Sequence, residues 1–330
     1  MRFLITGAAG FIGQSLSKSL LLQGHSVFAL DSMNPYYSLE LKRLRVKELY
    51  DLSNEDRFTF TQADVSDEKI SSVVKDFSPE IVVHLAAQPG VRLGISGAKQ
   101  YSRDNIEAFL KILGATVDSD AKSFLFASSS SVYGVTSSTP FSEEEIELQP
   151  ASIYGVTKLA NEMFASTIKD SGVRCRGMRF FSVYGPRGRP DMAYFRAIAA
   201  SLFGSQFYLN GTGEVARDFT YIDDVCQSIM LLSEELNVRP FGFNDVVNIG
   251  GGSPVTINHL INVVSEKTGK HIDVVNRSSI QEDLPLTQAN YRYLQLLTNK
   301  TRFLDFEKGI EETISWFLNY PASEVLSWLK

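Results

Sequence analysis

The stretch MRFLITGAAGFIGQSL, residues 1–16, combines a short apolar strand, a glycine-rich turn and the beginning of a helix. The glycines of the turn, Gly7, Gly10 and Gly13, allow a sharp bend and a close backbone approach to a pyrophosphate. The N-terminus of the helix that follows offers unpaired N–H donors and a positive potential. This order of strand, turn and helix therefore predicts a dinucleotide site at the first strand–helix junction.

Two acidic residues at the ends of later strands refine this prediction. Asp31 closes the second predicted strand, where its carboxylate can accept hydrogen bonds from both adenosine ribose hydroxyls and would repel a 2′-phosphate. We therefore expect NAD rather than NADP. Asp64 follows the third predicted strand, at the rim where an adenine would lie, although a helix cap is an equally good interpretation. The glycines are spaced Gly-x2-Gly-x2-Gly, not as in the usual fingerprint, so they would be weak evidence alone.

Apolar runs and helical patterns alternate along the first half of the chain, which is typical of βαβ units and a parallel sheet. We expect strands at 2–6, 26–30, 57–61, 81–85, 123–127 and 174–180, and helices at 12–23, 39–50, 68–77, 98–117 and 152–170. Beyond residue 182 this rhythm breaks into short strands at 206–209 and 246–249 and helices at 221–236, 256–268 and 307–319. The predicted fold class is α/β, with a Rossmann-type doubly wound parallel sheet in residues 1–181. A smaller, interleaved C-terminal α/β substrate lobe is expected in residues 182–330.

The overall composition narrows the classes of partner. The formal net charge of −6 argues against nucleic acid or an anionic membrane as the main partner. No run approaches the roughly 18 apolar residues of a membrane helix, and no signal peptide precedes the first strand. Cys175 and Cys226 are read as free core thiols, consistent with a reducing compartment. We expect a soluble, cytoplasmic enzyme without a metal.

Tyr154 and Lys158, in YGVTK at 154–158, lie one turn apart on the same face of a predicted helix. A tyrosine with an ordinary pKa near 10 is a poor base at neutral pH, but a neighbouring ammonium and a positive nicotinamide ring favour its phenolate. The lysine can also hold the nicotinamide ribose. Such pairs are common on helices, and this one gains weight from the dinucleotide site that accompanies it.

A serine run, Ser128 to Ser131, follows a buried strand and leads into VYG at 132–134. Open parallel sheets bind their ligands at the carboxyl ends of their strands, which is where these hydroxyls would lie. A plain polar loop is the alternative interpretation. Together with the glycine turn and Tyr-x3-Lys, the run predicts the floor of a catalytic site.

At this point the sequence resembles the extended short-chain dehydrogenase/reductases, and among them the NAD-dependent epimerases and dehydratases. The segments that carry the resemblance are GAAGFIG (7–13), HLAAQPGVR (84–92), ASSSSVYG (127–134), YGVTK (154–158), RFFSVYGPRGRPDM (179–192) and RDFTYIDD (217–224). The last two look most like UDP-glucuronate 4-epimerases. Asn34-Pro35-Tyr36-Tyr37, followed by a basic helix, resembles a loop of that subfamily.

The resemblance implies a role for each matching residue. Ser129 would hydrogen-bond the reacting C4 oxygen, Tyr154 would act as the base and Lys158 as its electrostatic partner. Further cofactor contacts are implied for Phe11, Ile12, Val65, Leu85, Ala86 and Ala87. The substrate contacts implied are Ser129, Ser130, Ser131, Ser182, Arg189, Arg217 and Asp283. In this scheme the serines hold a sugar carboxylate, Arg189 positions a segment around the sugar, and Arg217 pairs with the diphosphate.

The implied reaction interconverts UDP-glucuronate and UDP-galacturonate by transient NAD-dependent oxidation at C4 through a 4-keto intermediate. Dehydratases of the family place Asp-Glu after the Ser129 position and decarboxylases a glutamate, whereas this chain has Ser130 and Ser131. That departure argues against dehydration and, less firmly, against decarboxylation. A 4-epimerase for UDP-glucose or UDP-N-acetylglucosamine stays open, because the segments 93–97, 281–285 and 297–300 depart from the family pattern.

Relatives commonly dimerise through the helices expected at 98–117 and 152–170. Apolar residues beyond one core stripe occur there, including Phe109, Leu113, Met163 and Phe164, so we expect a homodimer. Packing of these side chains on the sheet is the alternative.

Overall fold

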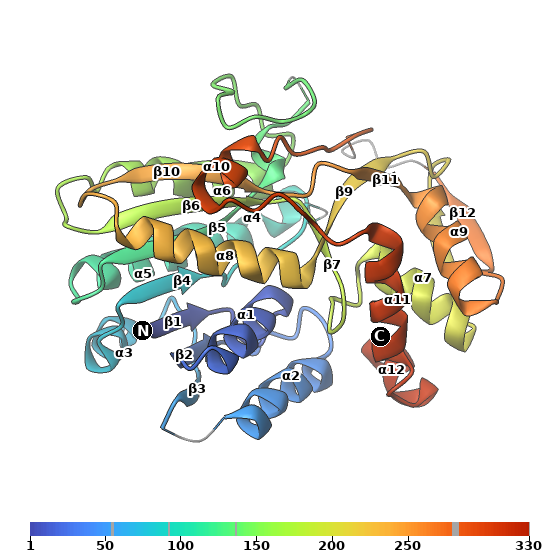
Figure 1. Ribbon diagram of the computed structural model, residues 1–330, viewed down its shortest axis with the longest axis horizontal. Coiled ribbons are helices and arrows are strands. Elements are labelled where there is room, and N and C mark those ends of the chain that lie inside the picture. Colours follow the sequence, from blue (N-terminus) through green and yellow to red (C-terminus); the bar gives the residue numbers. More distant parts are fainter. Residues whose placement is uncertain (54–55, 92, 136, 279–283, 330) are drawn as a thin grey trace.

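A parallel sheet forms the centre of the computed structural model, which describes residues 1–53, 56–91, 93–135, 137–278 and 284–329 (Figure 1). Its seven strands lie in the order β10-β6-β5-β4-β1-β2-β3, and every neighbouring pair is parallel. The strands are β1 (Arg2–Thr6), β2 (Ser26–Asp31), β3 (Phe58–Gln62), β4 (Ile81–His84), β5 (Ser123–Ser129), β6 (Arg174–Phe180) and β10 (Asn244–Ile249). The order reverses between β1 and β4, and the carboxyl ends of these two strands flank the point where open α/β sheets bind ligands.

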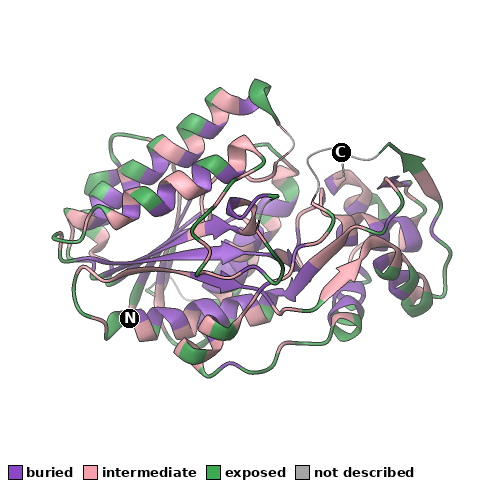
Figure 2. Cartoon of the chain, turned by 90° about the horizontal axis from the view of Figure 1, so that it is seen from above, coloured by how far each residue is buried: buried purple, intermediate pink, exposed green. Residues whose placement is uncertain are grey.

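Helices cover both faces of this sheet. One layer contains α1 (Phe11–Leu22), α2 (Leu39–Leu52) and α8 (Ile222–Asn237), whose apolar side chains join one core cluster with β1 and β2. The other contains α3 (Ile70–Phe77), α5 (Ala108–Val117) and α6 (Ile153–Ser166), which pack on the opposite face. Figure 2 shows the strands as buried, with exposed residues on the outer faces of the helices and in loops. Strands covered on both faces favour apolar residues, which explains the apolar runs of β1, β4 and the first part of β5.

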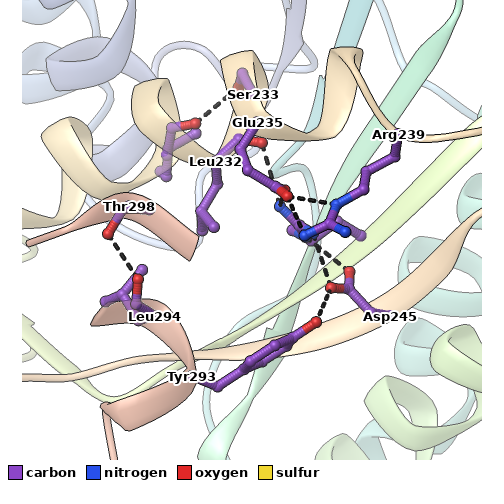
Figure 3. A network of polar contacts seen from close by, with 10 residues as sticks. Leu232, Ser233, Glu235, Arg239, Asp245, Tyr293, Leu294 and Thr298 are labelled. Atoms are coloured by element: carbon purple, nitrogen blue, oxygen red, sulfur yellow. Dashed lines mark hydrogen bonds and ion pairs between the residues drawn. The ribbon is translucent and has the colours of Figure 1, made fainter. Parts of the chain in front are cut away.

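The strand β10 comes from the second half of the chain but completes the large sheet beside β6. A buried cation joins the two, since Arg176 of β6 donates to both carboxylate oxygens of Asp245 at 2.7 and 2.8 Å. Arg176 also donates to Glu235 of α8, and Tyr293 of α10 (Arg292–Thr298) donates to Asp245 (Figure 3). Sheet, α8 and α10 are thus held together by charged groups as well as by apolar contacts.

The remaining elements form a smaller lobe at the carboxyl edge of the large sheet (Figure 1). It contains a three-stranded sheet, β11-β9-β7, and a two-stranded sheet, β12-β8. The bounds are β7 (Ser182–Tyr184), β8 (Phe207–Asn210), β9 (Ala216–Tyr221), β11 (Pro254–Thr256), β12 (Val274–Arg277), α7 (Ala193–Phe203), α9 (Ile257–Thr268), α11 (Phe306–Phe317) and α12 (Ala322–Trp328). No helix in the described ranges has the length and apolar character needed to span a bilayer.

The predicted fold class is confirmed, and the strands at 2–6 and 174–180 have the predicted limits. The single helix expected at 98–117 is a composite: α4 (Ala98–Tyr101) and α5 are joined by a π-helical stretch at Ser102–Glu107. Asn105, inside that stretch, donates to Thr157 of α6 and exchanges hydrogen bonds with Gln88. The wider turn thus accompanies a buried amide that links three segments beside the sheet edge.

Candidate active site

A cleft opens at the carboxyl edge of the sheet, between the two lobes. Its lining includes all thirteen of the sequence-predicted cofactor residues: Gly7, Gly10, Phe11, Ile12, Gly13, Asp31, Asp64, Val65, Leu85, Ala86, Ala87, Tyr154 and Lys158. Ser129 and Arg189, which were predicted on the substrate side, also line it. The structure therefore brings the glycine turn and the Tyr–Lys pair to one cavity.

The glycine turn has the shape that a phosphate site requires. A Cβ atom on Gly7, where φ is +70°, would lie 2.7 Å from the backbone nitrogen of Ala86, and one on Gly13 would lie 2.2 Å from the carbonyl oxygen of Gly7. The N-cap residue of α1 is Gly10, which has no side chain to accept from the first N–H groups of the helix. The first turn of α1 carries no acidic residue either. The first N–H groups of α1 are thus left for an anion, so the turn fits a dinucleotide pyrophosphate.

Asp31 is held at the end of β2 by backbone donors. Its Oδ2 accepts from the N–H of Ala9 at 3.1 Å, and its Oδ1 accepts from that of Met33 at 2.8 Å. The Nζ of Lys42, which also lines the cleft, lies 3.8 Å from Asp31 Oδ1. The carboxylate is therefore fixed at the position that a ribose would reach, with a cation beside it that sequence reasoning did not assign.

Asp64 lies at the rim of the same cleft. Its Oδ1 accepts from both the backbone N–H and the hydroxyl of Ser66, at 2.9 and 2.8 Å. Its backbone carbonyl accepts from Asp67, but α3 begins only at Ile70. The alternative of a direct helix cap therefore does not describe this residue, which shapes the loop before α3.

Tyr154 and Lys158 extend from the first turns of α6 into the cleft. The helix begins with Ser152, whose hydroxyl accepts from the N–H of Gly155 at 3.1 Å. Lys158 is buried, and its Nζ lies 5.7 Å from the centre of the Tyr154 ring. Among the described residues Lys158 makes no hydrogen bond or ion pair, so its three donors remain available to a bound molecule.

Burial governs the electrostatics of both groups in the protein alone. It lowers the pKa of Lys158 to about 8, and it raises the pKa of Tyr154, against which the Ser129 hydroxyl and the charge of Arg189 act. The expected lowering of the tyrosine pKa combined the lysine ammonium with the nicotinamide ring, and the protein groups alone do not produce it. The positive nicotinamide ring, the other charge in that argument, belongs to the cofactor.

The floor of the cleft continues from the end of β5. Ser129 Oγ accepts from the backbone N–H of Ser131 at 3.1 Å and lies at the same distance from the Ser131 hydroxyl. Beneath it, Ser128 donates to the buried carboxylate of Glu162, which also accepts two hydrogen bonds from Arg179 at 2.9 and 2.8 Å. Glu162 lies one turn after Lys158 on α6. The ion pair with Arg179 therefore joins α6 to β6, and the hydrogen bond from Ser128 joins it to β5.

Arg189 enters the cleft from the segment after β7. Its guanidinium forms a two-pronged ion pair with Asp191, at 3.0 and 2.5 Å, and lies 5.9 Å from the centre of the Tyr36 ring. Burial acts to lower the pKa of Arg189, but the pair with Asp191 outweighs it and raises that pKa, so Arg189 stays charged. Arg189 and Tyr154 both line the cleft, and the charge of Arg189 opposes the rise in the pKa of Tyr154.

Four of the other substrate-side predictions, Ser130, Ser131, Ser182 and Arg217, are not among the residues that line the cleft. Ser130 and Ser131 begin a short 3-10 turn (Ser130–Val132), and Ser182 begins β7. Arg217 of β9 donates to the carbonyls of Ala216 and Leu284 at 2.9 and 2.6 Å. Asp283 lies outside the described residues. The neighbouring Asp218 is buried and accepts from the backbone of Gly251, Gly252 and Ala289, so it is a structural hub of the smaller lobe.

A comparison with protein families shows which family the chain belongs to. The profile of the NAD-dependent epimerase/dehydratase family matches residues 3–250, which is most of the chain. The chain belongs to this family. NAD is therefore its cofactor, and the glycine turn, Asp31 and the donors of Lys158 are the groups that would hold it.

Individual members of the family are similar along nearly their whole length. Protein CapI of Staphylococcus aureus is 36% identical over 97% of this chain and 99% of that protein. A probable UDP-glucuronate 4-epimerase of Rhizobium meliloti is 35% identical over 96% of this chain and 97% of its own. The crystal structure of the UDP-glucuronic acid 4-epimerase from Bacillus cereus, with UDP-glucuronic acid and NAD, superposes with a TM-score of 0.88. It is 31% identical and covers 97% of this chain and 99% of the other.

Several residues of this epimerase-family cleft were not assigned by sequence reasoning. They include Ser32, Asn34, Tyr36, Tyr37, Lys42, Gln88, Arg103, Asp104, Phe181 and Met192. The loop after β2 was recognised as similar to one of the subfamily, which was a signal for Tyr36 and Tyr37. For Lys42 the only signal was the basic character of the following helix. Its place beside Asp31 depends on how α2 packs.

Proposed function

We propose that the chain is a UDP-glucuronate 4-epimerase, which interconverts UDP-glucuronate and UDP-galacturonate by transient oxidation at C4. One observation carries the proposal: Tyr154, Lys158 and Ser129 share a single cleft with the glycine turn and the Asp31 carboxylate, which would bind the pyrophosphate and the ribose of the cofactor. The relatives with this activity, matched over nearly all of the chain, support it.

Tyr154 would take the proton of the C4 hydroxyl, and Ser129 would hydrogen-bond the same oxygen. Lys158, which has a lowered pKa but no protein anion beside it, would hold the ribose hydroxyls and favour the phenolate of Tyr154. NAD would supply the acceptor for the C4 hydride and return it to the opposite face of the sugar. The cofactor is regenerated in each turnover, so the reaction is an isomerisation.

The carboxylate of the substrate imposes a second requirement. A 4-keto hexuronate is a β-keto acid. It loses CO₂ when its C5–C6 bond lies parallel to the π orbitals of the C4 ketone. Ser130, Ser131 and Ser182 would hold this carboxylate by neutral hydrogen bonds, with Arg189 above the sugar. The serines offer no group that delivers or removes a further proton, which supports epimerisation over dehydration.

We further propose that residues 1–181 hold the cofactor and that residues 182–330 supply most contacts to the nucleotide part of the UDP-sugar substrate. Arg217 would pair with the diphosphate, and Asp283 would contact the uridine side. In the structure the Arg217 side chain already donates to Leu284, which directly follows that position. Arg217 is therefore anchored to the segment with which it would act.

The test is a direct assay of products. Purified enzyme is incubated separately with UDP-glucuronate, UDP-glucose and UDP-N-acetylglucosamine, and the sugars are separated by chromatography. We expect UDP-galacturonate from the first substrate, at a kcat/KM above those of the other two. A UDP-pentose or an accumulated 4-keto product without UDP-galacturonate would overturn the proposal, and a higher kcat/KM with UDP-glucose would move it to a neutral sugar.

We also propose that the enzyme is a homodimer joined through α5 and α6. Phe109 and Leu113, which sequence reasoning offered for this interface, are buried in the core of the chain itself, whereas Leu110, Val156 and Met163 are exposed. Met163 is 64% exposed on the helix that carries the catalytic pair. Replacing it with glutamate is expected to convert a dimer to a monomer in sedimentation experiments, and a monomeric parent protein would contradict the proposal.

A cytoplasmic location is proposed with it. Cys175 and Cys226 are both free and buried, which fits a reducing compartment. Fractionation of cells that produce the protein is the test, and we expect the protein with the cytoplasmic fraction.

A further inference from the structure

Arg45 of α2 is fully buried, and each of the five N–H groups of its guanidinium donates to a neutral acceptor. Its Nη1 donates to the carbonyl of Ala9, in the glycine turn, and to the Tyr37 hydroxyl, at 3.0 and 2.6 Å. Its Nε and Nη2 donate to the carbonyl of Arg187 at 3.0 and 2.6 Å, and Nη2 also reaches that of Gly188 at 2.9 Å. One side chain thus joins the glycine turn to residues 185–192, which we call the arginine segment.

The arginine segment is held in an unusual conformation at this contact. Arg187 has a φ of +62°, in the left-handed region that residues other than glycine rarely adopt. Its guanidinium forms an ion pair with Glu48, one turn along α2 from Arg45. A Cβ on the next residue, Gly188, would fall 1.5 Å from the Tyr194 hydroxyl. Such a backbone persists only where its surroundings over-determine it, and α2 supplies two of those contacts.

The other end of the arginine segment carries Arg189 into the active site. Arg189 follows Arg187 by two residues and lines the cleft together with Tyr154. Arg45 itself is not among the residues that line the cleft, although it donates to Tyr37, which is, and to Ala9 in the glycine turn. Any effect of Arg45 on the reaction must therefore pass through the segments it joins.

We propose that Arg45 is a positioning residue that locks the arginine segment onto the glycine turn, so that Arg189 is held in the same cleft as Tyr154 only when both segments are in place. Its consequence for catalysis rests on the proposed 4-epimerase function. The lock itself is a property of the fold and does not depend on the substrate.

The lock has a consequence for the pH dependence of the reaction. Tyr154 is faced by Lys158 on its own helix, Ser129 at the end of β5, Tyr101 of α4 and Arg189 of the arginine segment, and His84 of β4 lies near Lys158. Arg189, in turn, is faced by Asp191, Tyr36 and Tyr37. Because the Arg189 charge favours the phenolate, loss of its position raises the pKa of Tyr154 further. The acid limb of the kcat/KM profile then moves to higher pH.

The test compares Arg45→Lys with the wild-type holoenzyme. Lysine keeps the charge but cannot donate in a fork to three carbonyls. We expect hydrogen exchange to speed up in residues 185–192, kcat/KM for UDP-glucuronate to fall about tenfold or more, and the acid limb to shift to higher pH. Arg43→Lys, an exposed arginine on the same helix, is the matched control and should change none of these.

A second variant keeps the test decisive if Arg45→Lys fails to fold. Glu48→Gln removes the charge that pairs with Arg187 and keeps an acceptor oxygen for Gln14 and Tyr320, which also donate to Glu48; it should show the same three changes in smaller measure. Unchanged exchange in residues 185–192 in the folded variants would overturn the proposal, as would lost activity with an unaltered pH profile. If the wild type itself does not epimerise UDP-glucuronate, the proposed function fails, while the exchange measurement still decides whether the lock exists.

Discussion

Lys158 and Tyr154 lie on one face of α6, with the lysine Nζ 5.7 Å from the centre of the tyrosine ring. In the proposed mechanism the phenol takes the proton of the C4 hydroxyl, and Lys158 holds the cofactor ribose and favours the phenolate. Tyr154→Phe should therefore lower kcat by about 10³-fold, while the affinity for NAD and the melting temperature stay close to those of the wild type.

The measurement is the rate of UDP-galacturonate formation together with NAD binding to cofactor-free protein. Tyr50→Phe, an exposed tyrosine on α2, is the control for removal of a hydroxyl. A Tyr154→Phe enzyme that retains full turnover would refute the assignment of the base.

Asp31 is expected to set both the affinity for NAD and the rejection of NADP. In Asp31→Asn the side chain keeps its size but loses the charge that favours two ribose hydroxyls and repels a 2′-phosphate. The dissociation constant for NAD should rise about tenfold, and the preference over NADP should shrink because Lys42 remains close by. Calorimetric titration of cofactor-free protein measures both, with the exposed Asp67→Asn as control. An unchanged preference would show that other residues select the cofactor.

His84 is expected to make the protein sensitive to acid. Burial, together with the charge of Lys158, lowers the pKa of His84 to about 3, whereas the unfolded chain has an ordinary value of 6.5. The unfolded state therefore binds a proton that the folded state excludes between these values. Stability from this source is present above pH 6.5 and is lost as the pH falls toward about 3.

His84→Asn keeps a polar group near Thr6, whose Oγ1 lies 2.7 Å from the Nδ1 of His84, and removes the titration. The free energy of unfolding of the wild type should fall relative to this variant by roughly 1 kcal/mol for each pH unit below 6. Urea unfolding at several pH values measures the difference, and the exposed His259→Asn provides the comparison. Parallel pH profiles for wild type and His84→Asn would contradict the argument.

The core elements of the fold were predictable because their signals are local. The strand β1 is covered on both faces and contains a short apolar run, and it was predicted with its observed limits. The strand β6 was also predicted with its observed limits, although it carries Arg174, Arg176 and Arg179. The helix α7 was missed because it is buried around most of its circumference and shows no clear polar face. The strand β9 was missed for a related reason: its charged residues, Arg217 and Asp218, break the alternation expected of a strand.

The site divides in the same way. The glycine turn and the pair Tyr154–Lys158 are defined by spacing within one element, so the sequence places them correctly in the cleft. Lys42 and Arg45 act across distances that only the packing of α2 establishes. Their targets, Asp31 and the carbonyl of Arg187, are 11 and 142 residues away, and no periodicity links such positions.

The buried charges around Arg176 provide a test of stability that leaves the chemistry untouched. Arg176 has no exposed side-chain surface and forms ion pairs with Asp245 of β10 and Glu235 of α8. In Asp245→Asn the guanidinium loses one of its two counter-charges while it remains buried, so the free energy of unfolding should fall by about 3 kcal/mol. Because none of these residues lines the cleft, kcat and KM of the folded enzyme should stay unchanged at a temperature below the transition.

Lys308→Gln, which breaks an exposed ion pair with Glu311, should leave the unfolding midpoint unchanged because solvent screens that pair. Chemical unfolding and initial rates measure the two quantities, and a loss of kcat at constant folded fraction would mean that β10 shapes the active site directly.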